Sequence, residues 1–114
     1  MATTLMDAGK LKSGKILSTK TDDNLQTTTL KLSNGATVIL KPTNFKNDEI
    51  MFRAISKGGH SLVKDADYYS ASNAAAIVTQ SGVGNFSAID LGNMLKGKNT
   101  NLAPNISLYS EGMN

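Results

Sequence analysis

The sequence predicts an α+β domain in which helices pack on one face of a mainly antiparallel sheet. Apolar and polar residues alternate on both sides of Asn34–Gly35, and a period of two is typical of a half-buried hairpin. Residues 66–80 contain no Gly or Pro and are followed closely by Gly82, which predicts a helix of about four turns. A strand-like alternation returns near residues 105–109. Strands, then helices, then a further strand indicate the α+β class.

The hairpin is predicted from strands near residues 28–33 and 36–42. An Asn-Gly pair supplies the positive φ angles that a tight hairpin turn requires. Pro42 has no backbone N–H, so it ends the second strand or lies at a sheet edge. The side chains expected on one face are Thr28, Leu30, Leu32, Ala36, Val38 and Leu40.

Residues 1–27 are predicted as a linker or N-terminal extension, and residues 28–114 as a partial α+β domain. The first segment is polar and is interrupted by Gly9, Gly14 and residues 22–24. Its short apolar piece at residues 15–17 is interpreted as an edge strand. A third strand of the sheet is expected near residues 49–56, ended by Gly58–Gly59.

Two helices are predicted on the same face of the sheet, near residues 66–80 and 88–96. Asp65 is placed to cap the first helix, and Ser87 with Asp90 resembles a capping box for the second. Small side chains at residues 71–76 permit close approach to a sheet, so we expect the first helix to be buried on more than one side. The last strand, near residues 105–109, is expected to have no following partner.

Composition excludes several classes of protein. The absence of cysteine rules out disulfides and thiolate metal sites. The net charge of +3 comes from lysines scattered along the chain, so we predict no nucleic-acid binding. No apolar run approaches the roughly 20 residues of a membrane span, and no signal peptide is recognised. The compartment is therefore unknown, and a periplasmic or other extracytoplasmic longer protein is compatible with the sequence.

Three motifs occur in an informative order. They are Leu32-Ser-Asn-Gly-Ala-Thr-Val-Ile-Leu40, Ser56-Lys-Gly-Gly59 and Gly82-Val-Gly-Asn-Phe-Ser-Ala-Ile-Asp-Leu91. Together they resemble the opening hairpin, the Gly-Gly strand exit and the Gly-Thr-x-x-Phe segment of a repeat in the pitrilysin/insulinase family of zinc metallopeptidases, which includes mitochondrial processing peptidase. The resemblance runs from about Leu30 to Gly112. It implies that this chain is a truncated portion of a metallopeptidase-like repeat.

Active members of that family carry His-x-x-Glu-His on the helix before the glycine of the third motif. Two imidazoles one turn apart hold zinc, and the carboxylate activates the attacking water. Alignment on Gly82 places Asn73, Ala76 and Ile77 at these positions, and the predicted helix contains no His and a single carboxylate, Asp67, near its start. We therefore expect no catalytic residue, no metal ligand and no cofactor in this chain, and the residues that bind substrate stay unknown.

The resemblance implies the inactive second repeat of such a protein. In that interpretation the chain is a noncatalytic structural fragment that helps to form a peptide-binding chamber, and zinc belongs to an active repeat elsewhere in the parent protein. The partners implied are the remaining repeats and the peptide substrate of the parent. Unpaired edges of a truncated sheet also predict a homo-oligomer formed through exposed strands.

Two alternative functions are kept. In the first alternative, the chain is a stand-alone module that binds a protein or a polyanion through a basic sheet surface. Such a surface would gather Lys31, Lys41 and Arg53 on neighbouring strands. Alternatively, the parent is an active peptidase and this segment contributes only in trans to a separate repeat. That alternative requires a His-x-x-Glu-His helix outside this chain.

Several other residues receive structural interpretations. His60, the single histidine, is predicted to be an exposed loop residue, not a base or a metal ligand. Asp65 and Asp67 are interpreted as helix-start residues that compensate the helix dipole, not as a catalytic pair. Tyr68, Tyr69 and Phe86 are expected to pack the helix ends.

Two short patterns carry little functional weight. Gly82-Val-Gly84 lacks the Lys-Ser/Thr and the preceding strand of a phosphate-binding loop. The sequons that begin at Asn85 and Asn105 are so short that chance occurrence is the default interpretation.

Overall fold

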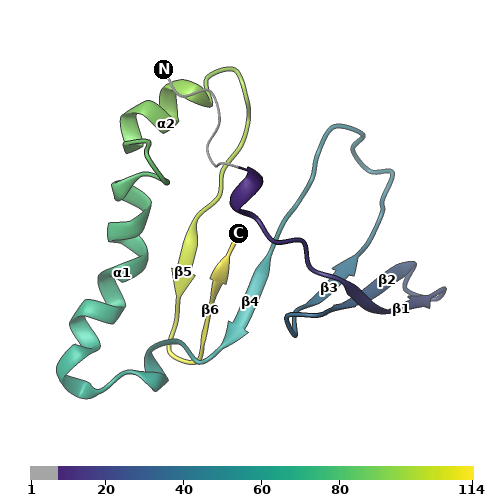
Figure 1. Cartoon of the computed structure of the whole chain (residues 1–114), viewed down its shortest axis with the longest axis horizontal. Coiled ribbons are helices and arrows are strands. Elements are labelled where there is room, and N and C mark those ends of the chain that lie inside the picture. Colours follow the sequence, from purple (N-terminus) through teal and green to yellow (C-terminus); the bar gives the residue numbers. More distant parts are fainter. Residues whose placement is uncertain (1–7) are drawn as a thin grey trace. The chain divides into compact units, whose positions relative to one another are not determined.

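The computed structural model describes residues 8–114, which fall into two compact units, residues 8–49 and residues 50–114 (Figure 1). The α+β class predicted from the sequence is confirmed. The single sheet is a wrong prediction, because the described strands form two separate three-stranded antiparallel sheets. The hairpin supplies one sheet, and the strands on either side of the helices supply the other.

The first sheet is built from β1 (Ile16–Asp22), β2 (Thr27–Leu32) and β3 (Thr37–Leu40), in that spatial order. The predicted hairpin is confirmed, and Leu30 and Val38, which are expected on one face, lie opposite each other in the β2–β3 ladder. At its turn, Gly35 has a φ of 87°, and the Asn34 side chain accepts a hydrogen bond from the Ala36 N–H at 3.0 Å. Asn and Gly therefore have separate roles in this turn.

Strand β1 lies within the segment interpreted as a linker or N-terminal extension, of which residues 1–7 fall outside the described part. The edge strand expected at residues 15–17 is found and is longer, because polar residues up to Asp22 continue to pair with β2. The Asp22 carboxylate accepts hydrogen bonds from the N–H groups of Asn24 and Leu25 at 3.0 and 3.1 Å. These bonds close the turn between β1 and β2.

The second sheet contains β4 (Ala54–Lys57), β5 (Pro104–Ile106) and β6 (Ser110–Met113), in the order β4-β6-β5. The strand expected near residues 105–109 therefore does have a following partner. Its successor, β6, lies in the centre of the sheet and pairs with both neighbours. Gly112 permits this placement, because a Cβ there would lie 2.0 Å from the Ala54 carbonyl oxygen.

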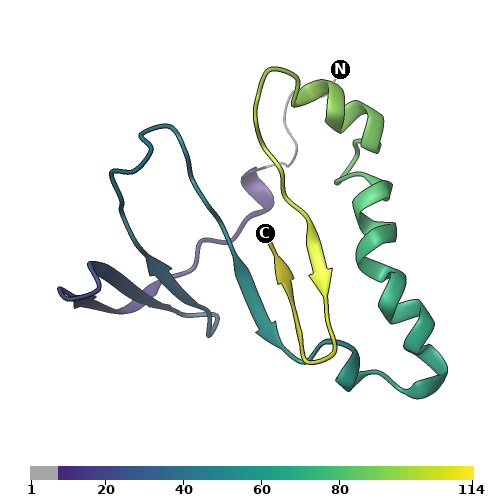
Figure 2. The same cartoon turned by 180° about the vertical axis from the view of Figure 1, so that it is seen from behind.

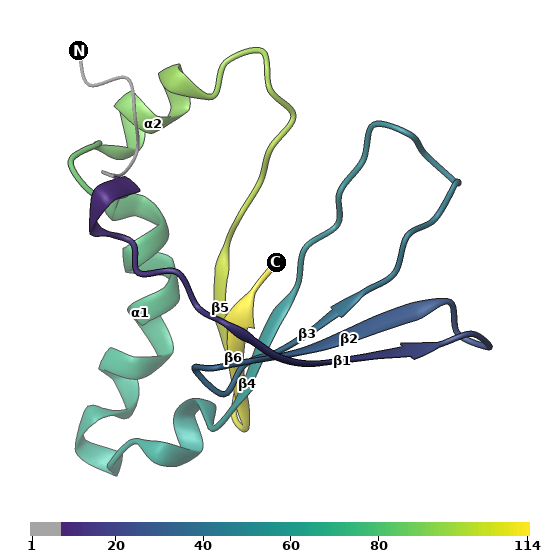
Figure 3. The same cartoon turned by 45° about the vertical axis from the view of Figure 1, so that its right-hand side comes forward.

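The helices lie in the same unit as the second sheet. Helix α1 (Tyr68–Ser81) packs against β5, and α2 (Ala88–Met94) follows it and contacts its end. Figures 1 and 2 show α1 beside β5 from opposite sides, and Figure 3 shows the same neighbours from an oblique direction. Three short 3₁₀ turns complete the described elements: Ala8–Lys10, Gly59–Leu62 and Asp65–Asp67.

The prediction that α1 is buried on more than one side is wrong. No residue of α1 is buried, and within residues 8–114 no apolar side chain is fully covered. The half-buried face of α1 consists of Ala71, Ala74 and Ala75. These small side chains bring the helix close to β5, as the sequence predicts, and they leave the opposite face open.

The turn after β4 depends on glycine. Gly59 has a φ of 59°, and a Cβ there would lie 2.1 Å from the Ser107 carbonyl oxygen. We predict that Gly59→Ala lowers the free energy of unfolding by about 1–3 kcal/mol, measured by urea denaturation.

Gly92→Ala is the matched control, because Gly92 lies inside α2 with no atom within 4 Å of the added Cβ. It should raise the free energy of unfolding by about 0.5–1 kcal/mol, since Ala is the better helix former. Equal effects of the two substitutions would show that the Gly59 contact is not a constraint on the fold.

Candidate functional site

The positions that correspond to the zinc motif lie on the open face of α1. Asn73, Ala76 and Ile77 are exposed, and Ile77 has 61% of its surface accessible. Successive residues of an α-helix are rotated by about 100°, which puts these three nearly opposite the half-buried alanines that meet β5. The motif face of α1 and its packing face are therefore different surfaces.

These three side chains offer no zinc-peptidase chemistry. Asn73 uses its amide nitrogen to donate to the Tyr69 carbonyl oxygen at 2.8 Å, one turn earlier in the same helix. Ala76 has no carboxylate to activate water, and Ile77 has no donor atom for a metal. Within residues 8–114, no group of three or more His, Cys, Asp or Glu side chains is arranged to hold a metal ion.

His60 lies at the junction between β4 and the β5–β6 turn, and the prediction of an exposed loop histidine is wrong. Its backbone N–H donates to the Ser107 carbonyl oxygen at 2.9 Å, which draws the residue against the turn. The imidazole is half-buried and meets the Tyr68 ring edge-on, with 5.4 Å between the ring centroids.

The Nε2 atom of His60 is buried and has no hydrogen-bond partner among the described residues. A general base needs a reacting group within hydrogen-bond reach, and a metal ligand normally needs companions. The position of His60 therefore matches a packing role better than a catalytic one.

The acidic residues before α1 do not cap it through their side chains. Asp67, not Asp65, is the N-cap residue of α1, and it makes no side-chain cap hydrogen bond. Asp65 begins the preceding 3₁₀ turn, whose own N-cap residue is Lys64. Asp65 and Asp67 are both exposed at the start of the helix, where negative charge is favourable. The prediction that Asp65 caps the helix is wrong.

The aromatic residues do not form one cluster. Tyr68 and Tyr69 stack edge-to-face, with ring centroids 5.7 Å apart, at the first turn of α1. Phe86 follows the other end of this 14-residue helix, about 20 Å away along the axis. Phe86 instead pairs with Val83 through two backbone hydrogen bonds of 3.0 Å.

The Gly82–Ser87 segment is a tight helix-to-helix connection. Gly82 has a φ of 88°, and a Cβ there would lie 2.0 Å from the Phe86 carbonyl oxygen. Ser87 caps α2 as predicted, because its Oγ accepts from the Asp90 N–H at 3.1 Å and donates to the Asp90 carboxylate at 2.7 Å. The glycines of this segment are explained by the turn, without a bound phosphate.

The two sequons differ in their surroundings. Asn85 is exposed in the turn between Val83 and Phe86. Asn105 lies in β5, where its amide donates to the Asn114 side-chain oxygen at 2.8 Å. Neither placement adds a functional argument.

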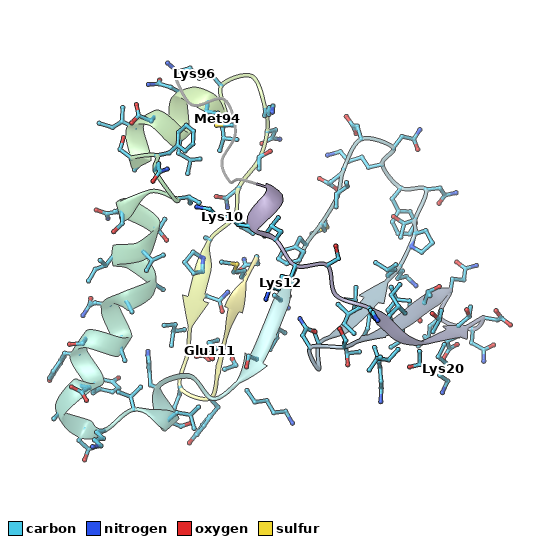
Figure 4. The ribbon with its side chains drawn as sticks, in the orientation of Figure 1. Lys10, Lys12, Lys20, Met94, Lys96 and Glu111 are labelled. Carbon is cyan, nitrogen blue, oxygen red and sulfur yellow. The ribbon has the colours of Figure 1, made fainter. Side chains whose placement is uncertain are left out.

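The basic residues of the first sheet are spread along its strands. Lys31 lies opposite Thr37 near the hairpin turn, whereas Lys41 reaches the Leu25 carbonyl oxygen at 2.6 Å near the other turn. Figure 4 labels Lys20 on β1 and Lys10 in the first 3₁₀ turn of the same unit, again at separate points. Arg53 belongs to the other unit. These three residues therefore do not lie on neighbouring strands of one sheet, as the basic sheet surface would require.

An exposed apolar run that the sequence does not mark as a functional surface lies just before β4. Ile50, Met51 and Phe52 have 96%, 90% and 59% of their surfaces accessible. They belong to the strand predicted near residues 49–56, but the ladder with β6 begins only at Ala54. The sequence indicates a strand at residues 50–52, but only the structure shows that these residues have no strand partner within residues 8–114.

No helix among residues 8–114 is long and apolar enough to cross a membrane.

One curated protein gives a partial match. The zinc protease PQQL-like protein of Arabidopsis thaliana is 39% identical to this chain over 56 residues. The matched part is 49% of this chain and 6% of that protein, so the chain spans only a small fraction of the relative it matches. No family model matches the chain, and no solved structure matches it. The partial similarity supports at most a relationship to pitrilysin-like zinc proteases.

Introducing donor atoms on the open face of α1 should create a metal site. We predict that Asn73→His with Ile77→His binds Zn²⁺, because imidazoles four residues apart share one helix face. Calorimetric titration measures the affinity. Zinc at one hundred times the dissociation constant should stabilise this variant by about 2.7 kcal/mol.

The control places the same two histidines on different faces, as Asn73→His with Thr79→His. Thr79 is exposed on α1, so the substitution is comparable in burial. Similar zinc affinity in both double variants would show that the helix face does not present residues 73 and 77 together.

Proposed function

We propose that this chain is a noncatalytic structural part of a zinc-protease-like protein, in which it helps to enclose the peptide substrate. The observation that carries the proposal is the open face of α1. The residues at the three motif positions lack ligand and base atoms, while the helix keeps its packing against β5. The partial similarity to a zinc protease-like protein supports the same family relationship.

The chemistry of α1 supports a covered position in a larger protein. Its 14 residues include no charged side chain, yet many of them are exposed. A helix that faces water along one side normally carries charges there, which favour solvation and oppose association. An uncharged outer face with Tyr69 and Ile77, 79% and 61% exposed, is instead suited to contact with another protein surface.

The first sheet supports a structural role in the same way. Leu30 and Leu32 alternate with polar residues along β2, Leu40 lies opposite Thr28 in the β2–β3 ladder, and none of the three is fully covered. A sheet with one apolar face is normally packed against a helix layer or a second sheet. We propose that the remaining repeats of the parent supply that cover and that zinc, the cofactor of the reaction, is held by one of those repeats.

The direct test is metal content together with peptidase activity of the purified chain. We expect substoichiometric zinc after dialysis and no cleavage of a quenched fluorescent peptide library, because the α1 positions lack a ligand pair and a base. An active zinc peptidase assayed in parallel provides the positive control. Stoichiometric zinc with chelator-sensitive cleavage would overturn the proposal.

The polyanion-binding alternative makes a separate prediction. If Lys31 and Lys41 formed a binding surface, Lys31→Glu with Lys41→Glu would abolish salt-sensitive retention on heparin. These lysines lie near opposite ends of the sheet, so we expect the unchanged chain to be retained only weakly. The double substitution should lower retention no more than the control double substitution Lys10→Glu with Lys20→Glu does. A selective loss with the first pair would favour the alternative function.

A further inference from the structure

Strand β4 is a free edge of the second sheet. Its ladder within the described residues is with β6, and the sheet order places β5 on the far side. Figures 1 and 2 show that α1 approaches the sheet from the β5 side, opposite β4. An edge strand presents unpaired N–H and C=O groups that pair readily with another strand.

The chain just before β4 extends this edge. Residues 50–53 lie outside the ladder, and Ile50 and Met51 are almost wholly exposed. The β-branched and aromatic residues here favour a strand, as the sequence analysis predicts. The chain has two prolines, Pro42 and Pro104, so every residue of 50–57 has an N–H to donate. Residues 50–53 of this strand-forming segment therefore have no ladder partner within residues 8–114.

We propose that residues 50–57 pair antiparallel with the same segment of a second copy of this chain, about a two-fold axis at Phe52. Each residue then lies opposite the one equally distant from the centre, so Phe52 meets Phe52 and Ile50 meets Ala54. An aromatic pair at the centre is favourable, whereas a centre at Arg53 would oppose two guanidinium groups. The second sheets of the two copies then form one continuous sheet. The two-fold symmetry limits the assembly to a dimer.

Charge complementarity selects a second copy as the occupant. In the proposed strand, which extends β4 back to residue 49, alternation puts Glu49, Arg53 and Lys57 on the same face. In the register centred on Phe52, Glu49 of one copy lies diagonally between Arg53 and Lys57 of the other, within reach of both. Glu49 already pairs with Lys46 at 3.2 Å, but this exposed pair is weak and does not prevent a second contact.

This proposal concerns the chain by itself and does not rest on the proposed function. Sedimentation equilibrium of the complete chain over a range of concentrations should show a reversible dimer. Ile50→Ser should weaken dimerisation by about tenfold, because both copies lose an apolar contact at the edge. Ile89→Ser is the matched control, since Ile89 is 77% exposed on α2, away from β4, and it should leave the dimer unchanged.

Two further variants test the strand pairing. Met51→Pro lies outside the β4–β6 ladder and removes an edge N–H, so it should abolish the dimer while far-UV circular dichroism stays unchanged. Glu49→Lys and Lys57→Glu should each weaken the dimer, and together they should weaken it less than the product of the single effects. A monomer at every concentration, equal losses with Ile50→Ser and Ile89→Ser, or a dimer that tolerates Met51→Pro would overturn the proposal.

Discussion

The second unit depends on one backbone junction, the docking of the Gly58–Gly59 turn onto the turn between β5 and β6. The N–H groups of Gly58, His60 and Ser61 donate to three consecutive carbonyl groups, those of residues 109, 107 and 108, at 2.8–2.9 Å. A side chain at Gly59 would collide with this backbone. The junction therefore joins the end of β4 to a turn that is distant in sequence, and it sets the point from which the chain enters α1.

Hydrophobic burial contributes less to the stability of this chain than its length would allow. A fully buried leucine or isoleucine contributes about 1.5–3 kcal/mol, and the described residues contain no such side chain. Hydrogen bonds in the ladders, turns and caps order the backbone, and each contributes a net stabilisation of only about 1 kcal/mol. Ordering the backbone of one residue costs a similar amount of conformational entropy, so these bonds add little net stability. The exposed leucines and isoleucines are the surfaces through which a packed neighbour would add stability.

The elements with local signals were predictable from the sequence. The Asn34–Gly35 turn fixed the hairpin register, and Ser87 marked the start of α2, because both effects act over a few residues. Strand β6 was missed, since Ser110–Met113 has no apolar alternation and is held by its neighbours on both sides. The division into two sheets was missed for the same reason, because pairing between distant strands leaves no local pattern.

The candidate site was predictable in its chemistry but not in its surroundings. The residue types at positions 73, 76 and 77 are read directly from the chain, whereas their exposure depends on which face of α1 meets β5. His60 shows the limit of local reasoning, because its half-buried ring is explained by a hydrogen bond to Ser107 and by the Tyr68 ring. Neither contact follows from the residues adjacent to His60 in sequence.

The geometry of α1 separates the residues that pack against β5 from those at the three motif positions. Packing uses Ala71, Ala74 and Ala75, and the motif positions lie on the opposite face. A ligand on an exposed face contributes little to the stability of the helix, so its replacement by Asn, Ala or Ile disturbs no contact with β5. Asn73, Ala76 and Ile77 carry no charge, so this face of α1 is uncharged. The lack of metal-binding side chains and the suitability of this face for protein contact therefore follow from the same three residues.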